Sequence, residues 1–315
     1  MKNDSSTHAI FRLLSVRGVG AARIRAAMKL ADGLRASLAD LIHDGTVLKS
    51  LLSVQQIQAL RSSDDIASEI WAKLQDNEVR VISILDSEYP KVVRQRLRHD
   101  APPLLFLRGN IDLLTKPSVG FCGSRKPSEK GTSVAKECAE IVSRQNLNVV
   151  SGYAAGVDIA THRTALQWGG STTLVLAEGI LHFKLKADLA GTWDWGRALV
   201  VSEYLPTITW NVGNAMRRNR VICALCEAMV LIEAREKGGS IDAGRTCLRL
   251  GVPLFAPVYE GMPESATGNR ILIKEGAKSL YKQKSSSRPN LTPLLHVFAG
   301  LPHDLSAASR GWMTQ

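Results

Sequence analysis

Phe121-Cys-Gly-Ser-Arg-Lys-Pro-Ser-Glu-Lys-Gly131 and Val149-Val-Ser-Gly-Tyr-Ala-Ala-Gly-Val-Asp158 are two glycine-containing loops, each placed where an apolar run ends and a helical pattern begins. Loops of this kind present backbone N–H groups at the N-terminus of a helix, where a phosphate group can bind. The first loop also carries Arg125 and Lys126. The two loops together predict a ligand that bears phosphate, either a nucleotide or a strand of nucleic acid.

Short apolar runs alternate with helical patterns on both sides of these loops. Continuous apolar strands separated by helices are typical of a parallel sheet that is covered on both faces. We therefore expect an α/β fold with a Rossmann-like, doubly wound, mostly parallel sheet, whose ligands bind at the carboxyl ends of the strands. Strands are expected at 79–85, 104–107, 118–122, 147–150, 172–176, 228–232 and 252–256, and helices at 133–145 and 159–168.

The first 75 residues have apolar positions at three- and four-residue spacing, which predicts a small helical domain. Within it, Gly18 and Gly20 lie between two short helical patterns, and Arg17 and Arg23 flank them. This arrangement resembles a helix-hairpin-helix, whose backbone N–H groups contact DNA phosphates, although a Gly-x-Gly turn also serves as a plain helix connector. We expect three parts: a helical domain (1–75), a Rossmann-like domain (76–282), and a linker with a short C-terminal tail (283–315).

The composition favours a polyanionic partner. The 315 residues carry a formal net charge of +11. Such an excess attracts polyanions, although it also serves solubility alone. We expect no membrane association, because the sequence lacks a run of about 20 apolar residues and an N-terminal signal peptide. The five cysteines follow no regular spacing, which favours reduced thiols in a cytoplasmic protein.

Two pairs of potential metal ligands are better explained as structural residues. Cys223 and Cys226 lie in an apolar helical run without a second pair at zinc-site spacing, so we expect them in the core. Asp158 and His162 stand four residues apart and share a helix face, a spacing that suits acid–base chemistry or half of a metal site. Because no third ligand or nucleophile is evident, we expect Asp158 to brace its loop and His162 to make a buried polar contact. No metal ion or cofactor is expected.

Eight short motifs follow one another between residues 89 and 280 in the order of a known family. They are Tyr89-Pro90, Pro102-Pro-Leu-Leu-Phe-Leu-Arg-Gly109, Gly123-Ser-Arg125, Val149-Val-Ser-Gly152 with Gly156-Val-Asp158 and His162, Ser202-Glu-Tyr204, Arg217-Arg-Asn-Arg220, Lys237-Gly-Gly-Ser240, and Gly268-Asn269 with Ile273 and Gly276-Ala277. This part of the chain resembles the DNA-processing protein A (DprA or Smf) family.

The resemblance implies a protein that binds single-stranded DNA, protects it and hands it to the RecA recombinase, as a homodimer and without enzyme activity. Arg125 and Lys237 would line one basic pocket, and Asn219 would fix loop geometry. The residues expected to bind DNA or phosphate are Gly123, Ser124, Arg125, Lys126, Ser151, Gly152, Gly156, Arg217, Arg218, Asn219, Arg220, Lys237, Gly239 and Ser240, and candidate contacts to duplex DNA or its backbone are Arg17, Gly18, Gly20 and Arg23.

The sequence also departs from the family's pattern in several places, among them Gly238, which replaces the usual serine of the Lys-Ser-Gly-Ser pattern. Ala155 stands in the second glycine loop where most members carry arginine. Ahead of the Ser202 motif, the family's Tyr-Pro-containing segment is replaced by one that contains Trp193 and Trp195. These tryptophans either offer stacking surfaces for unpaired bases or pack their segment onto the domain.

Two other functions stay open. The first is a DprA-like DNA-binding component of an antiphage defence or toxin–antitoxin module, with a toxin as its partner. The second is a nucleotide-binding sensor or a phosphoribohydrolase-like enzyme. The loop at 236–244 lacks the Gly-Thr pattern and the catalytic Glu of such enzymes, and Glu233 and Asp242 are the nearby carboxylates that could replace it.

Overall fold

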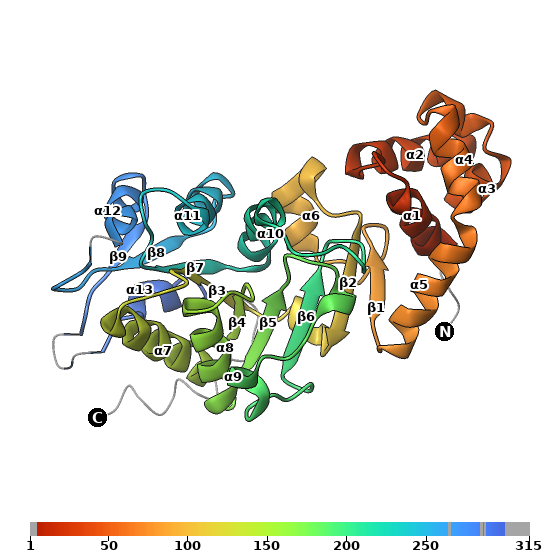
Figure 1. The fold of residues 1–315 in the computed structure, drawn as a ribbon. Coiled ribbons are helices and arrows are strands. Elements are labelled where there is room, and N and C mark those ends of the chain that lie inside the picture. The colour runs from red at the N-terminus through yellow and green to blue at the C-terminus, as the bar shows by residue number, and fades with distance from the viewer. Residues whose placement is uncertain (1–4, 264–265, 284–285, 287, 300–315) are drawn as a thin grey trace. The chain divides into compact units, whose positions relative to one another are not determined.

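The computed structural model describes residues 5–263, 266–283, 286 and 288–299 (Figure 1). The chain forms two compact units. Unit 1 is made of Met1–Arg108, Glu178–Phe183 and Val201–Trp210, and unit 2 of Gly109–Ala177, Lys184–Val200 and Asn211–Gln315. The division at residues 75 and 282 stays a prediction.

Unit 1 begins with the helices that the sequence predicts. They are α1 (Ser5–Ser15), α2 (Ala21–Leu34), α3 (Leu38–Asp44), α4 (Val54–Ser62) and α5 (Asp64–Asp76), with a 3₁₀ turn η1 (Val47–Ser50). Helices α3 and α4 start with capping boxes, in which Ser37 pairs with Asp40 and Ser53 with Gln56. The chain continues through β1 (Arg80–Ser83), α6 (Lys91–Leu97), η2 (Arg98–Asp100) and β2 (Leu104–Gly109), and β1 pairs with β2 in antiparallel register.

Unit 2 is built on a sheet with the strand order β6-β5-β4-β3-β7-β8-β9. Parallel pairing joins β3 to both β4 and β7, and continues from β4 to β5 and from β7 through β8 to β9. The order therefore reverses at β3, as in a doubly wound Rossmann-like sheet, and the predicted fold class is confirmed. The strands are β3 (Ser118–Gly123), β4 (Asn148–Ser151), β5 (Ser171–Val175), β6 (Ala198–Ser202), β7 (Ala228–Ile232), β8 (Leu254–Pro257) and β9 (Lys278–Leu280).

Helices cover both faces of this sheet (Figure 1). One face carries α7 (Glu129–Arg144) and α8 (Val157–Gln167), and the other carries α10 (Val212–Leu225), α11 (Gly239–Arg249) and α12 (Thr267–Lys274). Cys223 and Cys226 are fully buried at the end of α10, as predicted. Shorter elements are η3 (Ile111–Leu114), η4 (Ile180–His182) in unit 1, α9 (Ala187–Ala190) and α13 (Thr292–Leu295).

The segment around α13 differs from the expected linker. Leu291, Leu294 and Phe298 are buried in the same core cluster as residues of α7 and β3. Three apolar side chains at this spacing provide enough buried surface to hold a short helical turn against the sheet. Residues 300–315 of the predicted linker and tail (283–315) lie outside the described residues.

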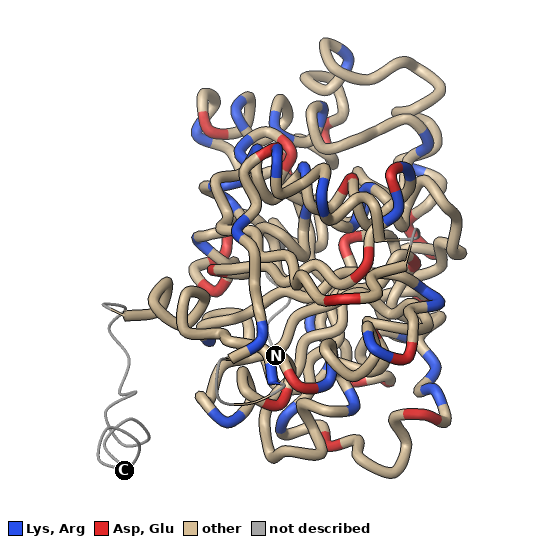
Figure 2. The backbone as a smooth tube through the Cα atoms, turned by 90° about the vertical axis from the view of Figure 1, so that its left-hand side faces the viewer, with Lys and Arg blue, Asp and Glu red and all other residues tan. Residues whose placement is uncertain are grey.

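Basic residues are spread along the described backbone and alternate with acidic ones (Figure 2). The positive net charge is therefore not confined to one segment, and a binding surface has to be argued from particular side chains. None of the helices that the structure describes combines the length and the apolar character that crossing a bilayer requires.

Candidate functional site

The first glycine loop leaves the carboxyl end of β3 in direct contact with β7. A Cβ atom on Gly123 would lie 2.0 Å from the carbonyl oxygen of Ile232, so only glycine fits there. The N–H of Ser124 donates to that same carbonyl at 3.2 Å. The loop then turns outward, and Arg125 and Lys126 are exposed to solvent. The close approach of two strand ends thus fixes the base of the loop and projects its two cations.

The second glycine loop packs against the first. Gly156 has a φ of +79°, which favours glycine, and its Cβ position would lie 2.5 Å from the carbonyl oxygen of Ser124. The N–H of Val157 donates to the same oxygen at 3.2 Å. At the start of the loop, the hydroxyl of Ser151 donates to the carbonyl of Phe121 at 2.7 Å. The two loops therefore form one continuous structure.

Helices α10 and α11 complete this structure. The amide of Asn219 donates to the carbonyl of Gly239 at 3.2 Å, and the hydroxyl of Ser240 donates to the carbonyl of Gly123 at 2.8 Å. Asn219 thus fixes loop geometry, as expected. We call residues 123–126, 151–156, 217–220 and 237–240 the loop cluster. Every segment of it is joined to another by a hydrogen bond or a close backbone contact.

The arginines of α10 do not all face outward. Arg217 is exposed and Arg220 is half-buried, but Arg218 is only 6% exposed. Its guanidinium donates to the carbonyl of Val175 and lies beside Gly152, where a Cβ would meet Nη2 at 2.5 Å. The expectation that all three arginines extend an exposed pocket is therefore corrected. The helix begins at Val212, and its periodicity turns position 218 toward the sheet.

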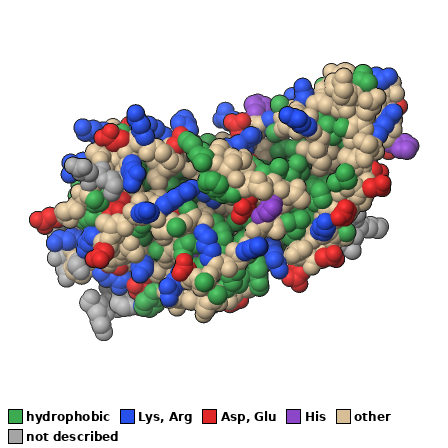
Figure 3. Space-filling model, viewed as in Figure 1, with side chains coloured by type: hydrophobic (Ala, Val, Ile, Leu, Met, Phe, Trp, Pro, Cys, Tyr) green, Lys and Arg blue, Asp and Glu red, His purple; other side chains and the backbone are tan. Residues whose placement is uncertain are grey.

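Four cations remain at the rim of the loop cluster: Arg125, Lys126, Arg217 and Lys237 are all exposed. Figure 3 shows that Lys and Arg side chains gather over α11 and α12 on the face drawn in Figure 1. The assignment of individual residues to DNA binding stays a prediction.

The N-terminus of α7 is already occupied by a carboxylate. Glu233, which is 1% exposed, accepts a hydrogen bond from the N–H of Ser128 at 2.8 Å and further ones from the hydroxyls of Ser128 and Tyr259. Burial and the bond to Glu233 raise the pKa of Tyr259 above its usual value. The expectation that a phosphate binds at this helix end is therefore corrected, because the protein's own anion fills that position.

The N-terminus of α11 is different, because no side chain caps it. Its N-cap is Gly238, with a φ of +120°, and the exposed Lys237 directly precedes it. The first N–H groups of a helix have no partner within the helix, so this end offers donors beside a cation. Helix α8 also begins without a side-chain cap, but the N–H of Val157 already donates to the carbonyl of Ser124. Of the helix ends in the loop cluster, that of α11 is therefore the one best suited to a phosphate.

Asp158 and His162 have the structural roles that the sequence predicts. The carboxylate of Asp158 accepts from the N–H of Ala154 at 3.1 Å and so braces the second loop. The His162 ring is fully buried, with Nε2 2.7 Å from the carbonyl of Gly152 and Nδ1 2.6 Å from the hydroxyl of Thr172. Burial lowers the pKa of His162 to about 4, which keeps the ring neutral. Within the described residues, no group of three or more His, Cys, Asp or Glu residues is placed to hold a metal ion.

Lys186 contacts the second glycine loop, a role that the sequence pattern did not predict. Its ammonium donates to the carbonyl of Tyr153 at 2.7 Å and lies 4.3 Å from the centre of the Tyr153 ring. Lys186 belongs to the segment that stands in place of the family's Tyr-Pro-containing segment. This segment therefore brings a positive charge to the second glycine loop, where position 155 is alanine. The lysines at 184 and 186 were the available signal in the sequence.

The helical hairpin of unit 1 has the predicted turn between α1 and α2. Gly18 has a φ of +82°, and its carbonyl accepts from Nη1 of Arg23 at 2.6 Å. Arg17 is exposed, and its carbonyl accepts from the amide of Gln56 at 3.1 Å. These bonds stabilise the turn itself, and its contact with DNA stays a prediction.

The reversed strand order and the glycine loops at the strand ends define a Rossmann-like α/β protein. The family model described as "DNA recombination-mediator protein A" matches residues 80–288, and the chain belongs to this family. The chain is 36% identical to DNA processing protein DprA of Streptococcus pneumoniae over 197 residues, which cover 62% of this chain and 69% of that one. It is 27% identical to DprA of Bacillus subtilis over 214 residues, which cover 67% and 71% of the two chains.

Two solved structures resemble this one. The crystal structure of DprA from Streptococcus pneumoniae has a TM-score of 0.72 at 29% identity, covering 87% of this chain and 94% of that one. A structure described as showing the single-stranded DNA binding mode of DNA processing protein A from Helicobacter pylori has a TM-score of 0.54 at 24% identity, covering 64% and 90%. The second likeness is one of fold.

Proposed function

We propose that the loop cluster binds single-stranded DNA and that the protein acts as a recombination mediator. One observation carries this proposal: the exposed cations Arg125, Lys126, Arg217 and Lys237 surround interlocked glycine loops in a member of the recombination-mediator family. A groove for single strands needs cations that follow the phosphates and a backbone that allows close approach.

Each part of the loop cluster has a distinct task in this proposal. A phosphate lies at the N-terminus of α11, where Lys237 neutralises it. The planar guanidinium of Arg125 binds the next phosphate or stacks on a base. Arg217 continues the basic track along α10. Arg218 and Glu233 do not contact the DNA in this proposal, and they hold the loops in position.

A binding measurement tests this assignment. Fluorescence anisotropy of a labelled 20-nucleotide strand should show tight, salt-sensitive binding that exceeds binding of the matched duplex. We expect Arg125→Ala and Lys237→Ala each to raise Kd at least tenfold. Each lost phosphate contact should also reduce the slope of log K against log salt by about 0.7.

Lys136→Ala serves as the matched control, because Lys136 is an exposed lysine on α7, outside the loop cluster. It should bind the strand like the unmodified protein. Unchanged affinity in both Arg125→Ala and Lys237→Ala would show that the strand binds elsewhere.

We further propose that the protein protects the strand and passes it to RecA, as a homodimer that is not an enzyme and works in the cytoplasm. The free cysteines, of which four are buried, suit a reducing compartment. A nuclease-protection assay and RecA-driven strand exchange test the two roles, and light scattering tests the dimer. If Lys237→Ala stimulates strand exchange as well as the unmodified protein does, delivery to RecA does not run through the loop cluster.

A duplex-binding role for Arg17, Gly18, Gly20 and Arg23 is a separate proposal. Arg17→Ala should weaken duplex binding several-fold and leave single-strand binding unchanged. Unchanged binding of both duplex and single-stranded DNA would show that the helical hairpin does not contact DNA.

A further inference from the structure

Residues 184–186 of unit 2, which lie between β5 and β6, are fastened to the second glycine loop through Tyr153. The hydroxyl of Tyr153 donates to the carbonyl of Lys184 at 2.9 Å and accepts from the N–H of Lys186 at 2.7 Å. The ammonium of Lys186 donates to the carbonyl of Tyr153 at 2.7 Å and lies 4.3 Å from the centre of its ring. We call residues 184–186 the lysine segment. These hydrogen bonds and the cation–π contact hold its backbone against the loop.

The lysine segment carries a cation that the fold does not use. Lys184 is exposed, and its ammonium has no hydrogen-bond or ion-pair partner among the residues that the structure describes. The second glycine loop itself, at 151–156, contains no charged side chain. Lys184 therefore lies beside an uncharged loop and is held there by its backbone alone, which leaves its side chain able to contact a ligand.

The order of the strands places this cation in a row with those of the loop cluster. Strands β7, β3 and β4 are neighbours in the sheet, in that order. Lys237 follows the carboxyl end of β7, Arg125 follows that of β3, and the second glycine loop with Lys184 fastened to it follows that of β4. Neighbouring strands lie about 4.8 Å apart, so the row extends about 10 Å from β7 to β4 and continues to Lys184. A row of exposed cations suits a polyanionic strand, because successive phosphates can each meet a positive charge.

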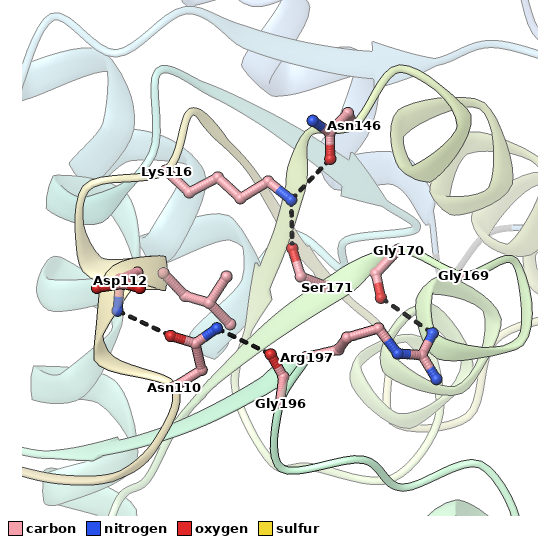
Figure 4. Close-up of a pocket in the computed structure, with 10 residues that line it drawn as sticks. Asn110, Asp112, Lys116, Asn146, Gly169, Gly170, Ser171, Gly196 and Arg197 are labelled. Atoms are coloured by element: carbon pink, nitrogen blue, oxygen red, sulfur yellow. Dashed lines mark hydrogen bonds between the residues drawn. The ribbon is translucent and has the colours of Figure 1, made fainter.

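The opposite edge of the same sheet is less suited to a polyanion. Figure 4 shows the pocket at the amino ends of the strands, where the protein engages both cations of the lining. Lys116 donates to the side chain of Asn146 at 2.9 Å, and Arg197 donates to the carboxylate of Asp194 at 2.7 Å. A carboxylate, that of Asp112, also lines this pocket. An anionic strand is therefore better accommodated at the carboxyl ends, where the cations are exposed.

We propose that Lys184 extends the strand-binding surface of the loop cluster across the second glycine loop, and that Tyr153 and Lys186 position it. This role rests on the strand-binding function proposed for the loop cluster. The ligand is the phosphate backbone of single-stranded DNA, and the ammonium of Lys184 neutralises one of its phosphates. Tyr153 acts through Lys184, because its hydroxyl holds the backbone of the lysine segment at both ends.

Fluorescence anisotropy with a labelled 20-nucleotide strand tests the contact itself. Lys184→Ala should raise Kd about fivefold and lower the slope of log K against log salt by about 0.7, the value for one phosphate contact on a single strand. Lys136→Ala, at an exposed lysine of α7, is the matched control and should change neither quantity. An unchanged salt slope in Lys184→Ala overturns the proposal, because a lysine that only supports the fold does not set this slope.

Tyr153→Phe tests the positioning role. It removes the hydroxyl with its two hydrogen bonds to the lysine segment and keeps the ring beside the Lys186 ammonium. We expect Kd to rise several-fold, and we expect Lys184→Ala to have little further effect in the Tyr153→Phe background. Circular dichroism and thermal unfolding show whether each variant is folded. If the two effects on log K add up in the folded double variant, Tyr153 does not position Lys184 and that role is overturned.

Arg125→Ala and Lys237→Ala, measured with the same strand, separate this proposal from the one on which it rests. Weakened binding in these two variants, together with unchanged Kd and salt slope in Lys184→Ala, overturns the role of Lys184 and leaves the loop cluster as the binding site. Unchanged binding in both Arg125→Ala and Lys237→Ala removes strand binding from the loop cluster, and both proposals then fail.

Discussion

Replacing Glu233 by glutamine tests whether this carboxylate braces the fold or performs chemistry. Glu233→Gln keeps the shape of the side chain and removes its charge. The glutamine oxygen can still accept from the N–H of Ser128, but its NH₂ group then faces the hydroxyls of Ser128 and Tyr259. Both hydroxyls must reverse and become acceptors.

The expected loss of stability follows from these contacts. A hydrogen bond to a charged group contributes about 1.5–3 kcal/mol and a neutral one about 0.5–1.5 kcal/mol, so three weakened bonds amount to about 3 kcal/mol. Removing the negative charge from the N-terminus of α7 adds about 0.5 kcal/mol. Glutamine avoids part of the cost of burying a charge, which offsets some of the loss. We expect Glu233→Gln to lower the free energy of unfolding by about 2 kcal/mol.

Urea unfolding followed by circular dichroism measures this difference. Glu236→Gln is the matched control, because Glu236 is exposed, and it should change the free energy of unfolding by less than about 0.5 kcal/mol. A double-mutant cycle with Tyr259→Phe should give a coupling of about 1 kcal/mol. If Glu233→Gln leaves stability unchanged and abolishes release of a base from a nucleoside monophosphate, Glu233 is catalytic and the bracing role is wrong.

Three further perturbations have defined outcomes. Gly156→Ala places a Cβ at a φ of +79° and 2.5 Å from the Ser124 carbonyl, so it should cost about 2 kcal/mol of stability and weaken strand binding. Unchanged stability would contradict the interlocking of the loops, and normal strand binding would contradict the role proposed for the second loop. Gly123→Ala should destabilise the protein more, because its Cβ would lie 2.0 Å from the Ile232 carbonyl, and thermal unfolding measures this. The pKa of His162 is about 4 when folded and near 6.5 when unfolded, so stability should be complete above about pH 6.5 and fall by up to about 3 kcal/mol as the pH drops toward 4. Urea unfolding between pH 7 and 4 should show this fall, with the exposed His296→Gln as a control; an equal pH dependence in His162→Gln would exclude His162 as its source.

The sequence pattern predicted most of the sheet. All seven expected strands are present. Five of them, β3, β4, β5, β7 and β8, are buried parallel strands, which form continuous apolar runs. The strands at Ala198–Ser202 and Lys278–Leu280 were missed. The first is a buried, nearly continuous apolar run, so its signal was present in the sequence. The second is a three-residue edge strand with an exposed lysine, which carries little apolar signal.

The sequence motifs predicted which segments lie together in the loop cluster, but they did not predict the direction of the side chains. The motif order brought the glycine loops, α10 and α11 together correctly, whereas it could not show that Arg218 turns inward. Once the start of the helix is known, the helical period places Arg218 on the same buried face as Ala215 and Ile222. Glu233 had no such signal, because the contact between the end of β7 and the start of α7 joins residues 105 positions apart.

The interlocked loop cluster has a consequence for the kinetics of binding. Its segments already hold one another through Gly156, Asn219 and Ser240, so little backbone freedom remains to be lost when a ligand arrives. Association should then be limited by encounter, which the positive net charge accelerates, and not by rearrangement of the protein. Most of the conformational entropy lost on binding is therefore lost by the flexible ligand and not by the protein. The affinity should depend more on the stiffness of the ligand than on mutations that tighten the loops further.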